Sequence, residues 1–463
     1  MNSFRTTIQS ARAGALHLLW LIALLAAPAI GQTTAKAPDF AADGVGIVKK
    51  LSAGDFAGIV SRFDAQMAKD LPQARLAEQW KSFSELTGAF VRVTKVSTTE
   101  ELGHFHSVAM TVAFAQAPQD NVLVVFDRSA HIAGLYFGPQ PTEALPNWKA
   151  PDYANSSRFH EIAITVEDNA WHLPGTLTVP NGTGPFPAIV LVPGSPPLDE
   201  DATVGPNKIF KDIAWGLASR GIAVLRYTKR AHHFGAGLGG GQLGAFTLNE
   251  ELNDDATAAL SLLSARQEIN HQQTYLLGHS LGGVAVTQMA QSHTTLAGIV
   301  VLGTPAGDLL TALVRRAEDA VAAGGEAGHM SAAVLPVLKK LRDRGFAPGD
   351  LAEMFGERNP AGFWEGLRGY QPGASAAKLK VRVLVGVGKH DAEVPPDDWE
   401  QWTKALSGRA NAALKLYPGL FHLFMPSTAT GKGDSPEDWG RPAHVDSAVV
   451  DDIASWILLG SKK

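Results

Sequence analysis

The stretch TYLLGHSLGG, residues 274–283, places a serine where it could act as a nucleophile. Ser280 lies between Gly278 and Gly282 in the pattern G-x-S-x-G, after an apolar run typical of a buried strand and before a segment typical of a helix. A sharp strand-to-helix turn projects a serine hydroxyl out of the sheet, and crowding there requires glycine two positions before and after it. We therefore predict that Ser280 is a nucleophile rather than an ordinary turn residue.

A serine hydroxyl needs a general base, and the base needs an acid that orients it. In sheets with this kind of turn, the acid and then the histidine follow the serine in the chain. Asp391 comes after the apolar run VRVLVGV, at the carboxyl end of a predicted strand, which favours it as the acid. Glu393, Asp397 and Asp398 are the alternatives, but they come after the turn, where we expect solvated surface.

Two histidines follow Asp391 in the chain. His422, in YPGLFHLF, comes directly after the last predicted strand, and a loop there can carry it back over Ser280. His444 stands at the entrance of the final predicted helix, where we expect a surface or capping residue. We therefore predict that His422 is the base. His279, beside the serine, is expected to pack near the site without acting on the hydroxyl.

The tetrahedral intermediate of acyl transfer needs hydrogen-bond donors for its oxyanion. The backbone N–H of Leu281, which opens the predicted helix after Ser280, is the first expected donor. The second is expected from the loop LVPGSPPLDED, residues 191–201. Proline has no N–H, so Ser195 is the candidate in this loop, and Gly194 would allow the backbone to approach closely.

The elements that must position these residues lie in residues 158–463, where apolar strand-like runs alternate with helical segments. Short continuous apolar runs are typical of parallel strands buried on both faces. The alternation predicts an α/β fold with a doubly wound, mostly parallel sheet. Residues 306–376 interrupt it with amphipathic helical stretches and no strand, so we predict a helical insertion over the carboxyl edge of the sheet. Two interpretations of the insertion stay open, a lid and packing alone.

Residues 40–140 show a different order, with helical periodicity first and alternation typical of strands afterwards. Two helical pieces separated at Gly54 and Asp55 are expected before residue 72, and another helix ends at Gly88. Helices followed by antiparallel strands predict a small α+β domain. It contains no recognisable nucleophile–base pair, so we expect a binding or spacing module.

The first 31 residues have the pattern of a secretory signal peptide. Arg5 and Arg12 precede an apolar run over residues 15–30, and small residues at the end of the run favour cleavage after Gly31. A run of this length is short for a membrane span. The expected location is therefore periplasmic or secreted, with no stable membrane span after cleavage.

The composition limits the chemistry. The chain of 463 residues is 45% hydrophobic and 18% charged with a formal net charge of −5, which is ordinary globular material with no electrostatic reason to bind nucleic acid. It contains no cysteine, so a disulfide, a thiolate nucleophile and a lipid-modified cysteine are all excluded. The sequence has no H-E-x-x-H or comparable ligand cluster, and neither a metal nor a cofactor is expected.

The segments PAIVLVPGSPP, LLGHSLGG, VLVGVGKHDAEVP and YPGLFHLF, in this order, resemble the α/β-hydrolase superfamily, specifically bacterial secreted serine esterases of the dienelactone-hydrolase-like group. The resemblance spans nearly all of residues 158–463 and implies a catalytic triad of Ser280, Asp391 and His422. The family loop usually reads G-S-G-P-x-D-R-D, whereas residues 194–201 here read GSPPLDED.

Residues 40–140 resemble an NTF2-like α+β domain of undefined function that often precedes such esterases. Taken together, the patterns predict an exported serine carboxylesterase that cleaves small-molecule esters with short to medium acyl chains through an acyl-enzyme on Ser280. Two alternatives stay open, a peptidase or amidase on the same fold and a catalytically idle binding protein.

Overall fold

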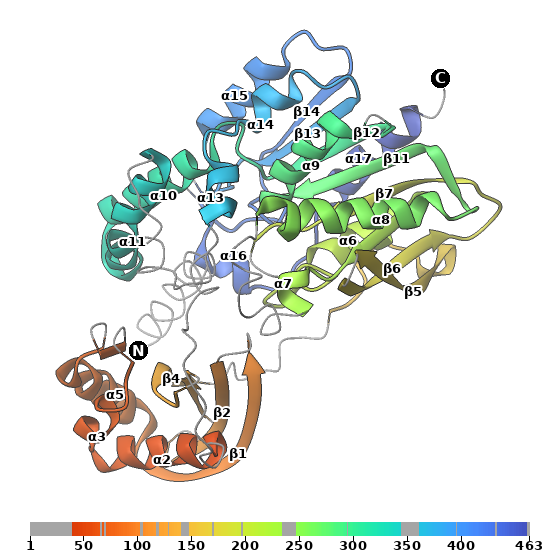
Figure 1. The fold of residues 1–463 in the computed structure, drawn as a ribbon. Coiled ribbons are helices and arrows are strands. Elements are labelled where there is room, and N and C mark those ends of the chain that lie inside the picture. Colours follow the sequence, from red (N-terminus) through yellow and green to blue (C-terminus); the bar gives the residue numbers. More distant parts are fainter. Residues whose placement is uncertain are drawn as a thin grey trace. The chain divides into compact units, whose positions relative to one another are not determined.

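The computed structural model describes residues 39–64, 67–68, 71–101, 105–116, 120–127, 129–139, 148–168, 171–195, 198–233, 247–293, 295–343, 361–394, 396–430 and 433–460. The predicted signal peptide, residues 1–31, and the prolines of the 191–201 loop that follow Ser195 lie outside these ranges. The chain divides into two compact units, one containing the described residues up to 139 and the other those from 148 onward. Each unit is described by itself (Figure 1).

The N-terminal unit has the predicted order of helices followed by strands. Its helices are α2 (Phe40–Ala53), α3 (Phe56–Val60) and α5 (Gln73–Thr87). Its antiparallel sheet has the order β1-β2-β3-β4, built from β1 (Phe90–Glu101), β2 (Phe105–Phe114), β3 (Asp120–Phe126) and β4 (Ile132–Pro139). Gly54 ends α2 in the left-handed conformation, and the Asp55 side chain caps α3, as expected from the break in the sequence. The predicted α+β arrangement of this unit is confirmed.

The C-terminal unit is built on an eight-stranded sheet of order β14-β13-β12-β11-β7-β10-β6-β5. Its strands are β5 (Phe159–Asp168), β6 (Trp171–Pro180), β7 (Phe186–Val192), β10 (Ala223–Tyr227), β11 (Ile269–His279), β12 (Gly298–Leu302), β13 (Arg382–Gly388) and β14 (Ala412–Tyr417). The pairs from β10 to β14 are parallel, and β6 and β5 form an antiparallel edge. The predicted α/β fold is confirmed.

β7 lies between β10 and β11 in the sheet: β10, the next of these strands in the chain, is on one side of β7, and β11 to β14 follow on the other side. In open α/β sheets, ligands bind outside the carboxyl ends of the strands at such a switch point. The loop after β7 begins at Pro193, and the turn after β11 holds Ser280, so the predicted nucleophile and the predicted oxyanion loop follow neighbouring strands.

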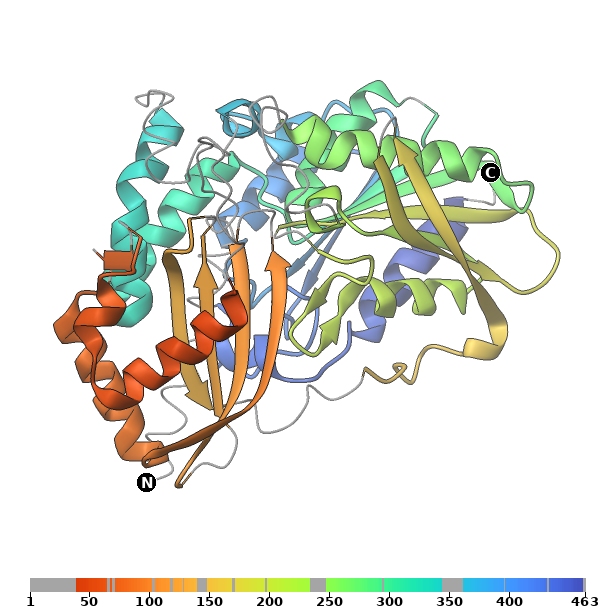
Figure 2. The same cartoon turned by 60° about the horizontal axis from the view of Figure 1, so that its bottom comes forward.

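Helices cover both faces of this sheet (Figure 2). On one face, α8 (Asp254–Ser264) follows a turn of π-helix, η4 (Asn249–Asn253), and packs on β7 and β11 beside α9 (Leu281–Ser292). On the other face, α6 (Ile209–Ala218) packs against α17 (Ser447–Gly460). The remaining short elements are η1 (Ser156–Arg158), β8 (Thr203–Val204), β9 (Asn207–Lys208), α7 (Arg230–His233), α15 (Pro396–Leu406) and α16 (Pro436–Gly440).

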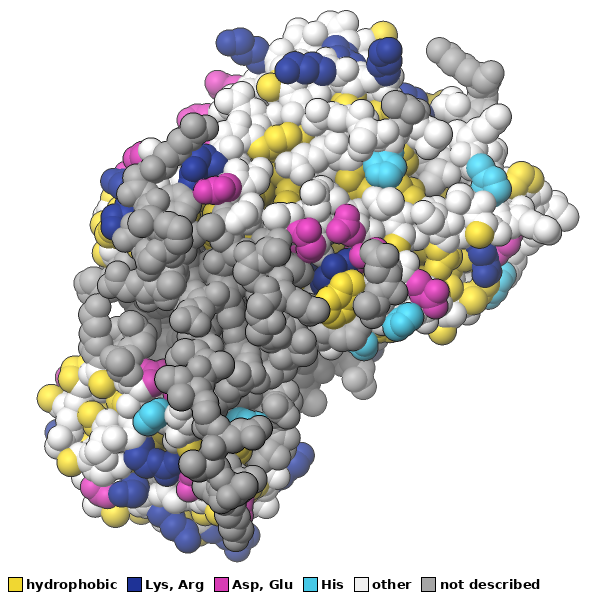
Figure 3. Space-filling view, viewed as in Figure 1, with side chains coloured by type: hydrophobic (Ala, Val, Ile, Leu, Met, Phe, Trp, Pro, Cys, Tyr) yellow, Lys and Arg dark blue, Asp and Glu magenta, His cyan; other side chains and the backbone are white. Residues whose placement is uncertain are grey.

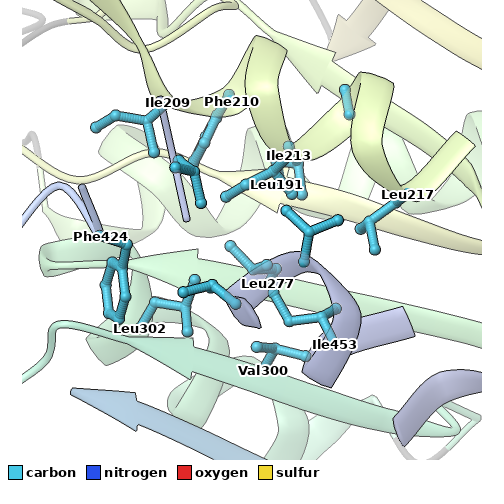
Figure 4. Close-up of a cluster of buried hydrophobic side chains, with 14 of the residues drawn as sticks. Leu191, Ile209, Phe210, Ile213, Leu217, Leu277, Val300, Leu302, Phe424 and Ile453 are labelled. Atoms are coloured by element: carbon cyan, nitrogen blue, oxygen red, sulfur yellow. The ribbon is translucent and has the colours of Figure 1, made fainter. Parts of the chain in front are cut away.

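Apolar side chains from the sheet and from α6 and α17 form one buried cluster (Figure 4). Leu191 of β7, Leu277 of β11 and Val300 of β12 are fully buried there, facing Ile213 of α6 and Ile453 of α17. Burying one such side chain stabilises the fold by about 1.5–3 kcal/mol. This core therefore fixes the carboxyl ends of the three strands relative to one another.

Between β12 and β13 the chain forms helices, as the sequence predicts for residues 306–376. They are α10 (Leu309–Ala323), α11 (Gly325–Asp343), α13 (Ala361–Leu367) and α14 (Pro372–Ala376), and α10 packs along α11. Trp364 of α13 is buried. Tyr370, which follows this helix, donates its hydroxyl hydrogen to Thr287 of α9 at 3.1 Å. Figure 3 shows lysine and arginine side chains gathered at the top of the C-terminal unit and aspartate and glutamate side chains nearer its middle.

Candidate active site

Ser280 occupies a strained turn between β11 and α9. Its backbone has φ 57° and ψ −122°, a left-handed region that costs a non-glycine residue about 1–3 kcal/mol. Two hydrogen bonds hold it there, because the Ser280 N–H donates to Leu302 O at 2.9 Å and the Thr304 hydroxyl donates to Ser280 O at 2.9 Å. Both partners belong to the end of β12 or the loop after it, so the neighbouring strand holds the turn.

The glycines around Ser280 have the role that the sequence pattern predicts. A Cβ atom on Gly278 would collide with the backbone of Gly282, and a Cβ atom on Gly282 would collide with the Val192 carbonyl of β7. The turn is therefore as tight as a nucleophile elbow requires. Gly194, in the loop after β7, packs on the same turn, and a Cβ atom there would lie 2.8 Å from the Ser280 Cβ.

Asp391 and His422 meet at the carboxyl edge of the same sheet. The His422 Nδ1 lies 2.9 Å from the Asp391 Oδ2, and both residues are buried. The other carboxylate oxygen of Asp391 accepts backbone N–H bonds from Glu393 at 2.8 Å and Val394 at 3.1 Å. At Gly303, after β12, a Cβ atom would lie 3.3 Å from both the Asp391 Oδ2 and the His422 Nδ1, so the chain passes close beside this pair.

His279 connects His422 to the serine turn. Its ring lies 4.7 Å from the His422 ring, and its Nε2 lies 2.9 Å from the His422 carbonyl oxygen. A carbonyl only accepts, so the Nε2 of His279 carries hydrogen and donates it. Burial, with a smaller effect of the neighbouring His422, lowers the pKa of His279 to about 3. His279 is therefore neutral and anchors the His422 backbone one residue from Ser280.

Charges around His422 favour its protonated form. Burial alone would lower its pKa, but the carboxylates of Asp391 and Glu393, aided by the hydrogen bond to Asp391, raise it to about 9. Glu393 Oε2 lies 3.3 Å from the His422 Nε2, and Glu393 Oε1 lies 2.9 Å from the Arg316 Nη1 of α10. The prediction that Glu393 lies on solvated surface is wrong, because its side chain is only 23% exposed and contacts the candidate base.

Of the other two acidic alternatives, one prediction is wrong and the other is confirmed. Asp398 is buried, and its Oδ2 lies 2.7 Å from the Arg315 Nη2 of α10. Asp397 is exposed, as expected from the sequence. The two residues open α15, and only Asp398 lies on the buried side of this helix, together with Trp402 and Leu406. Charge alone predicts exposure for both aspartates.

His444 does not approach the other candidate residues. Its Nδ1 lies 3.1 Å from the Oδ1 of the buried Asp212 of α6, and its side chain is 35% exposed. The hydrogen bond to Asp212 raises the pKa of His444 above its usual range, although burial opposes this. Its position before α17 and its exposure agree with the surface location expected from the sequence.

A buried lysine that the sequence analysis missed holds the loop after β7. The Lys229 Nζ donates to the Gly194 carbonyl at 3.0 Å and lies 2.5 Å from the Glu251 carboxylate. A trans peptide directs its C=O and N–H to opposite sides. The N–H of Ser195 therefore points away from Lys229. A Cβ atom on Gly194 would lie 3.4 Å from the Leu281 nitrogen, so the loop runs beside the first expected oxyanion donor.

No signal in the sequence identifies Lys229, because a lysine after a strand is ordinarily a surface residue. Its role depends on Glu251, which is distant in the chain, and on the return of the loop after β7. Among the residues that the structure describes, no group of three or more histidine, aspartate or glutamate side chains could hold a metal ion. No helix in the described ranges is long and apolar enough to cross a membrane.

Comparisons with known proteins agree with this architecture. Residues 45–135 match the family model described as a protein of unknown function, DUF3887, and residues 207–327 match the model described as serine aminopeptidase, S33. The esterase EstD of Thermotoga maritima is 33% identical over 414 residues, which cover 89% of this chain and 93% of EstD.

Two solved structures are also similar. The proline iminopeptidase of Mycobacterium smegmatis is 18% identical, with 65% of this chain and 100% of that chain covered and a TM-score of 0.41. The esterase domain of a Rhodothermus marinus protein is 18% identical, with 64% and 97% covered and a TM-score of 0.36. On its extended likeness to EstD and on its sheet, the chain belongs to the EstD family of α/β-hydrolase esterases and carries an N-terminal DUF3887 domain.

Proposed function

We propose that this protein is an exported serine carboxylesterase that acts through an acyl-enzyme on Ser280, with His422 as base and Asp391 as acid. The observation that supports this best is the buried Asp391–His422 pair, 2.9 Å apart, at the sheet edge where the strained Ser280 turn emerges. Likeness to an esterase over 89% of the chain supports the reaction class. No cofactor takes part in the proposed reaction.

In the first half-reaction, the Ser280 Oγ attacks the ester carbonyl carbon while the His422 Nε2 takes the hydroxyl proton. Asp391 accepts the Nδ1–H bond, which fixes the imidazole tautomer and stabilises the imidazolium. The negative charge moves to the carbonyl oxygen, where the backbone N–H groups of Leu281 and Ser195 donate to it. Collapse expels the alcohol, which takes the proton from His422.

In the second half-reaction, water attacks the acyl-enzyme and His422 takes a proton from it. The second tetrahedral intermediate collapses to the free acid, and the proton returns to Ser280. A Cβ atom on Gly194 would lie 2.8 Å from the Ser280 Cβ and 3.4 Å from the Leu281 nitrogen, and this closeness of the loop to the serine turn supports the assignment of both donors.

Three finer points belong to the same proposal. The acyl chains are short to medium in length. Residues 1–31 direct export and are removed, so the mature protein begins at Gln32 in the periplasm or outside the cell. The DUF3887 domain has the NTF2-like character suggested by its helices-then-sheet order. The mass of the N-terminal peptide of protein recovered from the periplasm tests the export step.

A peptidase or amidase is the second candidate function. The match of residues 207–327 to the serine aminopeptidase model favours it, and the same nucleophile and base would serve. The two candidates differ in the leaving group, which is an alcohol in one and an amine in the other.

The test is hydrolysis of p-nitrophenyl esters from acetate to palmitate by the mature chain and by Ser280→Ala. We expect turnover of short and medium esters by the wild type and loss of about 10⁴-fold or more in Ser280→Ala at unchanged thermal stability. Amide substrates and a fluorophosphonate probe are assayed in parallel. If the probe labels Ser280 and the protein cleaves amides but not esters, the result favours the peptidase. A wild type that is inert to esters, amides and the probe would identify an idle binding protein and contradict the proposal.

A further inference from the structure

The atom that must accept the serine proton already has a carboxylate beside it. The proposed mechanism needs the His422 Nε2 to face the Ser280 hydroxyl, yet this nitrogen lies 3.3 Å from the Glu393 Oε2. The Nδ1 of the same ring binds Asp391. Both ring nitrogens therefore face carboxylates, and Glu393 has no task in the reaction as described above.

Glu393 is held in this position from two sides. Its backbone N–H donates to Asp391, which fixes the turn from which its side chain leaves. Its second carboxylate oxygen lies 2.9 Å from the Arg316 guanidinium, and each of the two side chains is 23% exposed. Arg316 comes from α10, a helix of the insertion between β12 and β13. The pair thus links the inserted helices to the candidate base.

The charged and titratable groups around His422 come from four segments. Asp391 and Glu393 follow β13, and Asp434 precedes α16. Arg316 of α10 opposes these carboxylates, while His279 at the end of β11 is neutral. Burial lowers the pKa of His422, but Asp391 and Glu393 raise it to about 9, with the smallest effect from Asp434, whose own pKa burial raises to about 7. At neutral pH the imidazolium form of His422 therefore dominates. An imidazolium cannot take the proton of Ser280.

We propose that Glu393 is a positioning residue whose carboxylate competes with the Ser280 hydroxyl for the His422 Nε2, and that Arg316 weakens this competition. The inference rests on the proposed function, since it concerns the same base. A proton leaves His422 to solvent and the Glu393 contact breaks before Ser280 can be activated. Arg316 neutralises part of the Glu393 charge, so the inserted helix α10 sets how readily this occurs.

The two residues should therefore act in opposite directions. In Glu393→Gln, loss of one negative charge at contact distance moves the acidic limb of the kcat/KM profile to lower pH by about one unit. Activity near neutral pH then rises about tenfold, because one pKa unit is a factor of ten in the neutral fraction. In Arg316→Gln, the unopposed carboxylate moves the limb to higher pH, and activity near neutral pH falls.

Arg315→Gln is the matched control. Arg315 is the same residue type on the same helix, but its partners are Asp397 and Asp398, so its variant keeps the wild-type profile. The measurements are kcat/KM against pH and the pH dependence of fluorophosphonate labelling of Ser280, which reports the base without an ester substrate. Thermal unfolding of each variant verifies that it is folded.

A Glu393→Gln profile identical to that of the wild type, with labelling at the same rate, would overturn the inference. So would a uniform loss of activity at all pH values with an unshifted limb, because that is the signature of a merely structural residue. If the probe labels Ser280 in no variant at any pH, the proposed function fails and the inference fails with it. If Arg316→Gln does not fold, the shift in Glu393→Gln decides alone.

Discussion

Replacing Lys229 with methionine removes the buried ammonium that holds the Gly194 carbonyl while keeping most of the side-chain volume. The change has two separable costs. Glu251, whose side chain is 8% exposed, loses the partner that lies 2.5 Å away, and an unpaired buried charge destabilises a fold by about 3–5 kcal/mol. A second substitution, Glu251→Gln, removes that charge, so the double variant isolates the effect on the loop.

The second cost concerns catalysis. A hydrogen bond from a charged donor contributes about 1.5–3 kcal/mol, and without it the Gly194–Ser195 peptide no longer has a fixed direction. If that energy is lost from the oxyanion contact, kcat falls roughly 10- to 100-fold. Complete loss of one oxyanion donor costs about 10²–10³-fold, which sets the upper limit. KM should change little, because the carbonyl oxygen gains its charge only in the transition state.

The assay compares kcat and KM for p-nitrophenyl acetate in the wild type, Lys229→Met/Glu251→Gln and Lys415→Met, with urea unfolding of each. Lys415 is a matched control on β14, since it also pairs with a carboxylate, Asp452, at 2.8 Å but is 45% exposed. Its variant should lose less than about 1 kcal/mol of stability and no activity. A folded double variant with kcat within about twofold of the wild type would refute the positioning role of Lys229.

Two further predictions follow from the geometry. In Gly194→Ala, the new Cβ would lie 2.7 Å from the His279 carbonyl oxygen, so the loop must shift and kcat should fall about 10²-fold. A Cβ atom on Gly366 of α13 would meet open space, so Gly366→Ala should keep full activity. Equal kcat values for the two variants would contradict the positioning role of Gly194. The His444–Asp212 contact raises the folded-state pKa of His444, so its contribution to stability is present below the unfolded pKa and is lost as pH rises through the folded value. Because His444 is partly exposed, we expect His444→Gln to lower the free energy of unfolding by under about 1 kcal/mol at about pH 5.5. At about pH 9.5 the substitution should have no effect. An equal effect at both pH values would exclude the ion pair as the cause of the destabilisation.

The sequence reveals those parts of the candidate site that have a local pattern. Gly278 and Gly282 mark the serine turn because the crowding comes from residues close by in the chain and from the adjacent strand. Asp391 and His422 can be found because each follows an apolar strand, and the carboxyl ends of parallel strands share one edge. The helices and strands of both units can be predicted from hydrophobic periodicity, because that pattern also lies in residues close together in the chain.

The residues that sequence reasoning missed depend on contacts between distant segments. Lys229 is buried only because Glu251 and the loop after β7 converge on it. Glu393 is largely buried because it contacts both His422 and Arg316, and Arg316 comes from a helix inserted between two strands. Charge alone predicts exposure for all of these side chains. The partner that reverses that prediction lies elsewhere in the chain, and no spacing rule connects the two.

The strained serine turn also shows why the site depends on residues remote from it. A non-glycine residue at φ 57° persists only where its surroundings allow no alternative. Here the surroundings are the buried carboxyl end of β11, the buried first two turns of α9, and the Leu302 carbonyl at the end of β12. A cavity in the core beneath β12, such as Val300→Ala would create, removes part of that constraint. The turn can then relax before the domain unfolds, because relaxation releases the backbone strain at Ser280. In such a variant, activity should therefore be lost at a lower urea concentration than the one that unfolds the sheet.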